Sequence, residues 1–176
     1  ILLSDSTTPD AFKINELLNE MVLSDCKICF MEVSSHGIKQ KRILGIRFFG
    51  GVFTNISRDH LDYHKDLDDY ILTKKLFFDS LGEGAVAIVN KDDDFGEKML
   101  FDCKANKVFY GLYSKGLNHK AVVLENKLTG LLLEIDGQNV KTKIPGIFNA
   151  YNLLAIYALA IQIEKEKKNV IKSLIK

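Results

Sequence analysis

Side chains suited to metal and phosphate chemistry cluster between Thr54 and Phe78, in the sequence TNISRDHLDYHKDLDDYILTKKLFF. Asp59 and His60 follow an apolar run, and Glu32 lies near the end of another. A buried carboxylate is costly unless it is paired or bound to a metal. Oxygen ligands with one imidazole suit Mg²⁺ or Mn²⁺ that is held partly by substrate phosphates. A hydrogen-bonded His–Asp loop is the alternative, and the residue types alone favour neither.

His60 and His64 also have the i, i+4 spacing of two zinc ligands on a helix. The H-E-x-x-H motif places its glutamate directly after the first histidine, whereas here the acid, Asp62, stands one place further on. No third ligand is evident. A zinc hydrolase is therefore disfavoured.

Lys74 is the one charged residue in an apolar stripe with the spacing of a single helix face. The stripe consists of Leu67, Tyr70, Ile71, Lys74, Phe77, Phe78 and Leu81. In one interpretation the lysine stem packs and its ammonium reaches water. In the other, Lys74 enters a site, where it would repel a bound Mg²⁺ unless CO₂ converted it to a carbamate, an anion with two oxygens. Periodicity does not decide between them.

Length, charge and cysteine usage limit the class of protein. The 176 residues, 47% of them hydrophobic, suit one domain with a sizeable core. A net charge of +1 gives no field that would recruit nucleic acid or a membrane. No apolar stretch is long enough to cross a bilayer, and no signal peptide opens the chain. Three cysteines fit a reducing cytoplasm; Cys26 and Cys29 have redox spacing, but their apolar neighbours predict core packing.

The apolar periodicities predict strands that alternate with helices. A helix begins at Thr8-Pro9-Asp10 and runs to about Val22, and another spans 66–81. A third begins at the acids 92–94 and ends near Cys103. The predicted strands are 27–33, 50–56, 84–90 and 107–111.

Beyond residue 111 the pattern changes to closely spaced strands with turn signals such as Asp136-Gly137. These predict an antiparallel meander over 120–126, 130–136 and 139–145, followed by a helix over 149–163 and a last short helix. The fold class is therefore α/β, a mostly parallel sheet flanked by helices with a small antiparallel meander. Ligands in such sheets bind beyond the carboxyl ends of the strands, which singles out residues 32–36 and 55–64.

Several motifs together resemble the central, P-loop-NTPase-like domain of the Mur ligases. They occur in order as STTPDAF, MEVSSHG, Q-K-R, FTNISRDHLDYH, Y-I-L-T-K, VNKDD and GIFNAYN. Within that family the chain most resembles the UDP-N-acetylmuramoyl-tripeptide synthetases, commonly called MurE. The resemblance covers nearly the whole chain.

The resemblance implies a reaction and roles for individual residues. Such enzymes use ATP and Mg²⁺ to activate UDP-MurNAc-L-Ala-D-Glu as an acyl phosphate, which the amine of a third amino acid attacks to form an amide of a peptidoglycan precursor. It implies Glu32 and His60 as magnesium ligands and Lys74 as a carbamoylated lysine that also serves the metal. Substrate binding is implied for Thr7, Thr8, Ser34, Gln40 and Arg42, and adenine contacts for Asn149 and Asn152.

The resemblance also implies parts that the chain lacks. The family's ATP-binding G-x-x-G-K-[ST] loop does not occur in the sequence. We therefore expect residues 1–176 to be a central-domain fragment, without that loop and without the N- and C-terminal domains, inactive alone and monomeric. Two alternatives stay open: a folylpolyglutamate- or cyanophycin-type amide ligase, and a non-catalytic binding module of the same fold. Whether the third amino acid is diaminopimelate, lysine or a relative is not evident from the sequence.

Overall fold

The computed structural model describes residues 7–57, 63–164 and 166–175. The chain divides into two compact units. The first unit comprises residues 1–47 and 60–77, and the second unit comprises residues 48–59 and 78–176.

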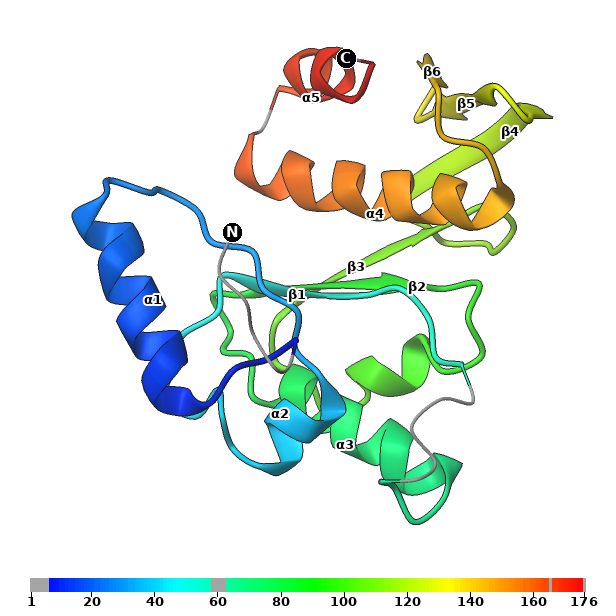
Figure 1. Ribbon diagram of the computed structural model, residues 1–176. Helices are drawn as coiled ribbons and strands as arrows, with labels where there is room; N and C mark the ends of the chain where they lie inside the picture. The colour runs from blue at the N-terminus through cyan, green and yellow to red at the C-terminus, as the bar shows by residue number, and fades with distance from the viewer. Residues whose placement is uncertain (1–6, 58–62, 165, 176) are drawn as a thin grey trace. The chain divides into compact units, whose positions relative to one another are not determined.

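The first unit is helical in the part that the structure describes. It contains α1 (Ala11–Leu23), α2 (Ser35–Lys39) and most of α3 (Leu67–Asp79), all labelled in Figure 1. Helix α1 begins where the sequence predicted, because the Asp10 side chain accepts a hydrogen bond of 3.0 Å from the Lys13 amide. Such a cap satisfies an amide that has no partner inside the helix. The short α2 was not predicted.

Residues 27–33, predicted as a buried strand, form no strand. Ile28 and Phe30 are 51% and 71% exposed. A buried strand needs hydrogen-bonded neighbours and cover on both faces, and the described ladders do not include these residues. Cys26 and Cys29 are exposed too, so the prediction that they pack in a core was wrong.

In the described residues, the second unit contains a six-stranded sheet in the order β1-β2-β3-β4-β5-β6. Its strands are β1 (Gly50–Phe53), β2 (Val86–Asn90), β3 (Asn106–Gly111), β4 (His119–Lys127), β5 (Gly130–Ile135) and β6 (Gln138–Thr142). The pairs from β1 to β4 are parallel, and the pairs from β4 to β6 are antiparallel. The predicted α/β class with a small antiparallel meander is thereby confirmed.

Two stretches show how local sequence produces this sheet. All five residues of β2 are buried, as expected for a central parallel strand with an unbroken apolar run. Asp136 and Gly137 connect β5 to β6 with φ angles of 45° and 83°. Two consecutive residues with positive φ form the tight turn whose twist matches an antiparallel hairpin.

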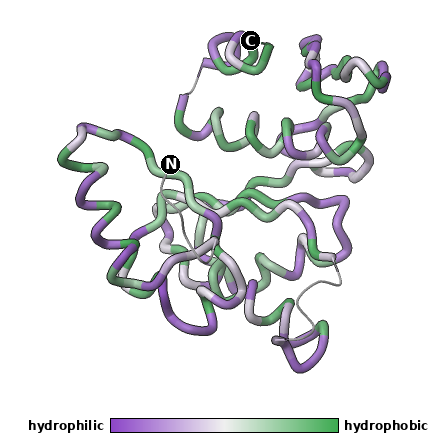
Figure 2. Tube along the Cα trace, in the orientation of Figure 1, coloured by the Kyte–Doolittle hydropathy of each residue, from purple (hydrophilic) through white to green (hydrophobic). Residues whose placement is uncertain are grey.

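Helices α4 (Ile147–Ile163) and α5 (Lys167–Leu174) complete the second unit. Helix α4 packs against β2, β3, β4 and β5, and α5 packs against α4 and β6 (Figure 1). Apolar residues of α4 and of the central strands (Figure 2) supply the core between them. No helix in the described part of the chain is long and apolar enough to span a membrane.

The helix predicted from the acids 92–94 to Cys103 is only a short 3₁₀ turn, Glu97–Leu100. Two of the acidic side chains instead accept hydrogen bonds from backbone amides in loops. The Asp92 carboxylate accepts hydrogen bonds from the backbone amides of Leu112, Tyr113 and Ser114. The side chain of Asp93 accepts from the Phe95 amide. The bond of Asp93 is of the local kind by which a short acidic side chain competes with helix formation.

The Asp136 carboxylate joins the meander to α4. Its oxygens lie 2.9 Å from His119 Nδ1, 3.2 Å from the Tyr157 hydroxyl and 3.0 Å from the Lys120 amide. Burial alone raises the pKa of this carboxyl, but the hydrogen bonds and the charge of His119 outweigh burial and lower it. The folded state therefore prefers the ionised form.

We expect Asp136→Asn to lower the free energy of unfolding by about 1–3 kcal/mol, because the amide cannot accept all of these bonds. Asparagine tolerates the positive φ, so the backbone is not strained. The folded pKa is depressed, so the loss should be full above the unfolded-state pKa of about 3.9. It should fade as the pH falls through the folded pKa. Urea denaturation between pH 2 and 7 measures this, with the exposed Asp94→Asn as control; equal losses in both variants would contradict the assignment.

Candidate functional site

Thr8 ties the N-terminal segment to the residues before α2. Its side chain is buried, and its hydroxyl donates to the Glu32 carbonyl at 2.8 Å and accepts from the Ser34 amide at 2.9 Å. The hydroxyl of Thr8 therefore holds the fold locally. The neighbouring Thr7 is exposed.

Ser34 sits at the N-terminal cap of α2. Its hydroxyl accepts from the Gly37 amide at 3.1 Å, and Ser34 itself has extended backbone angles. Gly37 packs so close to Thr8 that a Cβ there would lie 2.7 Å from the Thr8 methyl carbon. The Ser-Ser-His-Gly sequence thus supplies both the cap and the space for Thr8.

Gln40 and Arg42 follow α2 and contact each other. The Arg42 guanidinium donates to the Gln40 side-chain oxygen at 2.9 and 2.6 Å and to the Thr8 carbonyl at 2.5 Å. The Gln40 amide donates to the Tyr63 hydroxyl at 3.2 Å. Four of the predicted substrate residues, Thr8, Ser34, Gln40 and Arg42, are therefore joined in one polar network of the first unit.

Lys74 lies on α3 with the burial pattern that its stripe predicted. Tyr70, Ile71 and Phe77 are at most 8% exposed, whereas Lys74 is half-buried. The ammonium of Lys74 lies 5.2 Å from the centre of the Tyr70 ring. Burial lowers the pKa of Lys74, and the charge of Glu32 partly opposes that change. Glu32 itself is exposed, so the expectation of a buried carboxylate there was wrong, although its charge still acts on Lys74.

The other predicted metal ligand, His60, lies outside the described residues. Within residues 7–57, 63–164 and 166–175, no group of three or more histidine, cysteine or acidic side chains could hold a metal ion. The second histidine of the zinc-like spacing, His64, uses both ring nitrogens in hydrogen bonds, to Ser35 and to Asp69. His64 is therefore not free to bind zinc.

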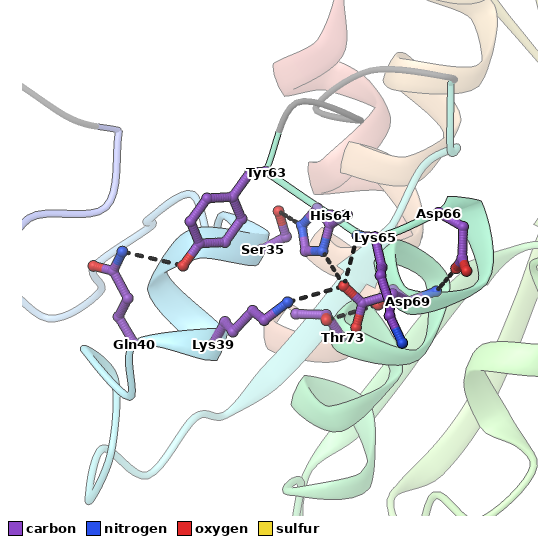
Figure 3. A network of polar contacts seen from close by, with 9 residues as sticks. All are labelled: Ser35, Lys39, Gln40, Tyr63, His64, Lys65, Asp66, Asp69 and Thr73. Atoms are coloured by element: carbon purple, nitrogen blue, oxygen red, sulfur yellow. Dashed lines mark hydrogen bonds and ion pairs between the residues drawn. The ribbon is translucent and has the colours of Figure 1, made fainter.

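A network around His64 and Asp69, drawn in Figure 3, was not predicted from the sequence. His64 is 3% exposed, and Asp69 also accepts from Lys39 at 2.9 Å. The hydrogen bonds from Lys39 and His64 lower the pKa of the Asp69 carboxyl to about 2. The sequence held one signal, a histidine just before a predicted helix with an acid five residues further on, but not the distant partners Ser35 and Lys39.

Asn149 and Asn152, the predicted adenine contacts, lie on α4 in the second unit. The Asn149 amide donates to the Pro145 carbonyl at 2.7 Å, and the Asn149 side chain is half-buried. Asn152 is exposed. One turn of helix separates the pair, so both can approach the same ligand.

A shallow polar cavity of about 390 Å³ also lies in the second unit. It is lined by Lys91, Asp92, Asp93, Asp94, Glu97, Tyr113 and Ser114. Hydrogen bonds from Ser114 and the neighbouring backbone outweigh burial and lower the pKa of Asp92 to about 2. Because its oxygens are occupied by the loop and by the Tyr151 hydroxyl, this carboxylate shapes the fold.

The chain is similar in sequence to a known protein family and to several of its curated members. Residues 2–160 match the family model of the Mur ligase middle domain. The chain is 45% identical over 168 residues to UDP-N-acetylmuramoyl-L-alanyl-D-glutamate–2,6-diaminopimelate ligase of Cytophaga hutchinsonii, and 46% identical over 171 residues to the protein of that name in Phocaeicola vulgatus. The matches cover 96% and 97% of this chain but 34% and 35% of the relatives. The chain thus spans about a third of the length of these curated relatives.

Solved structures give the same relationship. A structure of UDP-N-acetylmuramoyl-L-alanyl-D-glutamate–2,6-diaminopimelate ligase superimposes with a TM-score of 0.87 at 27% identity, covering 99% of this chain and 37% of that one. MurF from Acinetobacter baumannii superimposes with a TM-score of 0.65 at 20% identity over 73% of this chain and 29% of its own. The second likeness is one of fold alone.

Proposed function

Because the chain belongs to the Mur ligase middle-domain family, we propose that the protein containing it is an ATP-dependent amide ligase of peptidoglycan-precursor synthesis. Its proposed substrates are UDP-MurNAc-L-Ala-D-Glu and 2,6-diaminopimelate. The observation that carries the proposal is the identity of 45–46% to relatives named for this reaction, over almost the whole chain. We place the reaction in the cytoplasm, where ATP is available.

The proposed reaction has two steps. A carboxylate of the dipeptide attacks the γ-phosphorus of ATP, which gives an acyl phosphate and releases ADP. The amine of diaminopimelate then attacks the acyl carbon, loses a proton and expels phosphate, and an amide remains. Such phosphoryl transfer depends mainly on positioning and on charge stabilisation.

The network around α2 is the proposed binding site for the nucleotide-sugar peptide. Thr7, Ser34, Gln40 and Arg42 offer hydroxyl, amide and guanidinium groups, and a guanidinium suits a carboxylate or a diphosphate. Thr8 fixes the backbone between them, through the Glu32 carbonyl and the Ser34 amide. The substrate would meet groups that are already oriented, which reduces the entropy lost on binding.

Lys74 and Glu32 are the proposed charge-handling residues. A neutral lysine amine adds to CO₂ with formation of an N–C bond and release of a proton, and the depressed pKa of Lys74 favours that neutral amine. The Glu32 carboxylate and a Lys74 carbamate are oxygen donors of the kind that Mg²⁺ prefers, with His60 as the third proposed ligand. Bound Mg²⁺ would neutralise charge on the phosphoryl oxygens. Asn149 and Asn152 are proposed to contact the adenine, where amides can both donate and accept.

An assay of the full-length protein tests this function. With ATP and UDP-MurNAc-L-Ala-D-Glu, we expect diaminopimelate to be joined in an amide with release of one phosphate for each product. We expect lysine to react about 10⁴-fold less efficiently, because a site built for a second polar head group rejects an analogue that leaves its polar groups unpaired. Product mass and phosphate release measure both. No amide with any amino acid would refute the ligase, and preference for lysine would refute only the choice of amino acid.

A further inference from the structure

The segment Tyr63–Asp69 holds α2 at three points along its length (Figure 3). His64 Nε2 lies 2.8 Å from the Ser35 hydroxyl at the first residue of α2. The Lys39 ammonium, at the last residue, lies 2.9 Å from the Asp69 carboxylate. Gln40, the C-terminal cap, donates to the Tyr63 hydroxyl at 3.2 Å. A five-residue helix is not stable by itself, so such external contacts determine where it sits.

His64 occupies the centre of this attachment and has a defined tautomer in it. The Asp69 carboxylate is ionised and can only accept, so the proton lies on His64 Nδ1, 3.2 Å away. In the neutral ring Nε2 then accepts from the Ser35 hydroxyl. Both ring nitrogens of a side chain that is 3% exposed are thereby satisfied. Removal of either partner would leave a buried polar atom without a hydrogen bond, which is costly.

The same ring also contacts the helix that carries Lys74. The rings of His64 and Tyr70 have centroids 4.9 Å apart. The Lys74 ammonium lies 5.2 Å from the centre of that Tyr70 ring. His64 therefore contacts α2 through Ser35 and α3 through Asp69 and Tyr70.

The Ser35–His64–Asp69 arrangement resembles a hydrolase triad in its order of contacts, but its burial argues against that chemistry. Ser35 is 2% exposed, so its hydroxyl has no path to a substrate carbonyl. A nucleophilic serine must reach the reacting atom, and a histidine that only orients other groups need not. The geometry supports a positioning role.

We propose that His64 is a positioning residue that fixes α2, and with it the substrate-binding groups of Ser34, Gln40 and Arg42, relative to the Lys74 helix. The inference rests on the proposed function for the identity of the ligand. It assigns to His64 no contact with substrate, ATP or metal. The buried contacts of His64 thus hold α2 and its substrate-binding groups in position.

The test uses Ser35→Ala and His64→Asn in the full-length protein. Ser35→Ala deletes one hydroxyl and keeps the Ser34 cap, and His64→Asn keeps a donor near the Nδ1 position but loses the bond to Ser35. We expect each to raise the KM for UDP-MurNAc-L-Ala-D-Glu about tenfold, with the KM for ATP within about twofold of wild type. The double variant should lose little more than either single variant, because both remove the same hydrogen bond. Ser173→Ala, an exposed serine on α5, is the matched control.

Hydrogen exchange in the same variants without substrate supplies a readout that does not depend on the reaction. We expect the amides of residues 35–42 to exchange about tenfold faster in Ser35→Ala and His64→Asn, and at the wild-type rate in Ser173→Ala. Unchanged exchange would overturn the positioning role even if the protein proved to be no ligase. Equal rises in both KM values, or additive losses in the double variant, would overturn it as well. Absence of turnover in the wild type would count against the proposed function alone.

Discussion

Lys74→Ala is expected to lower kcat of the full-length ligase by at least about 10³-fold. Alanine can form neither the ammonium nor a carbamate, so the proposed oxygen donor beside Glu32 is lost. The fold should survive, because Lys74 is only half-buried, whereas the other residues of its stripe are apolar, and alanine favours helices. Steady-state kinetics together with circular dichroism would separate loss of turnover from loss of structure.

Lys75→Ala is the matched control, since it removes an equal charge from the next position of α3. That position is about 100° further round the helix, so a change of less than about threefold is expected. A short carboxylate such as acetate or propionate should restore part of the activity of Lys74→Ala by occupying the place of the carbamate. If both lysine variants lost activity equally, a general effect of positive charge on α3 would explain the result, and the specific role of Lys74 would be wrong.

Glu32→Ala is expected to reduce kcat by about 10²–10³-fold with a smaller effect on the KM for the nucleotide sugar. The carboxylate acts in the proposal on charge that develops during phosphoryl transfer, and its backbone carbonyl, which receives the Thr8 hydroxyl, is kept in the variant. The requirement for Mg²⁺ should shift to higher concentration. Titration of Mg²⁺ at saturating ATP measures that shift.

Glu20→Ala removes an exposed glutamate from α1 and serves as the control for Glu32. His60→Ala should behave like Glu32→Ala, since the resemblance assigns both to the same metal. Near-normal kcat with ordinary Mg²⁺ dependence in the Glu32 and His60 variants would show that neither residue serves the metal.

Elements with strong local signals could be predicted from the sequence. The unbroken apolar run of β2 and the Asp136-Gly137 turn specify their own conformation through burial and backbone preference. The start of α1 follows from the Asp10 cap for the same reason. The prediction of a strand at 27–33 was wrong, because an apolar run does not indicate whether neighbouring strands are available to pair with it.

The candidate site was predictable only in part. The stripe around Lys74 follows from helical periodicity, and the motifs singled out Ser34, Gln40 and Arg42, which one network joins. The contacts around His64 were missed because they join residues far apart in the sequence. His64 and Ser35 are 29 residues apart, and Lys39 and Asp69 are 30 residues apart. Pairings over such distances depend on tertiary structure, which no local pattern encodes.

In the proposed site, Lys74 works as a carbamate. The most direct measurement is ¹³C NMR of the active full-length protein in ¹³C-bicarbonate, compared with Lys74→Ala and Lys75→Ala. We predict one carbamate resonance in the wild type and in Lys75→Ala, and none in Lys74→Ala. If the fully active wild type gave no carbamate resonance, Lys74 would be an ordinary lysine whose stem packs on α3 while its ammonium reaches solvent, and the proposed charge-handling role would be wrong.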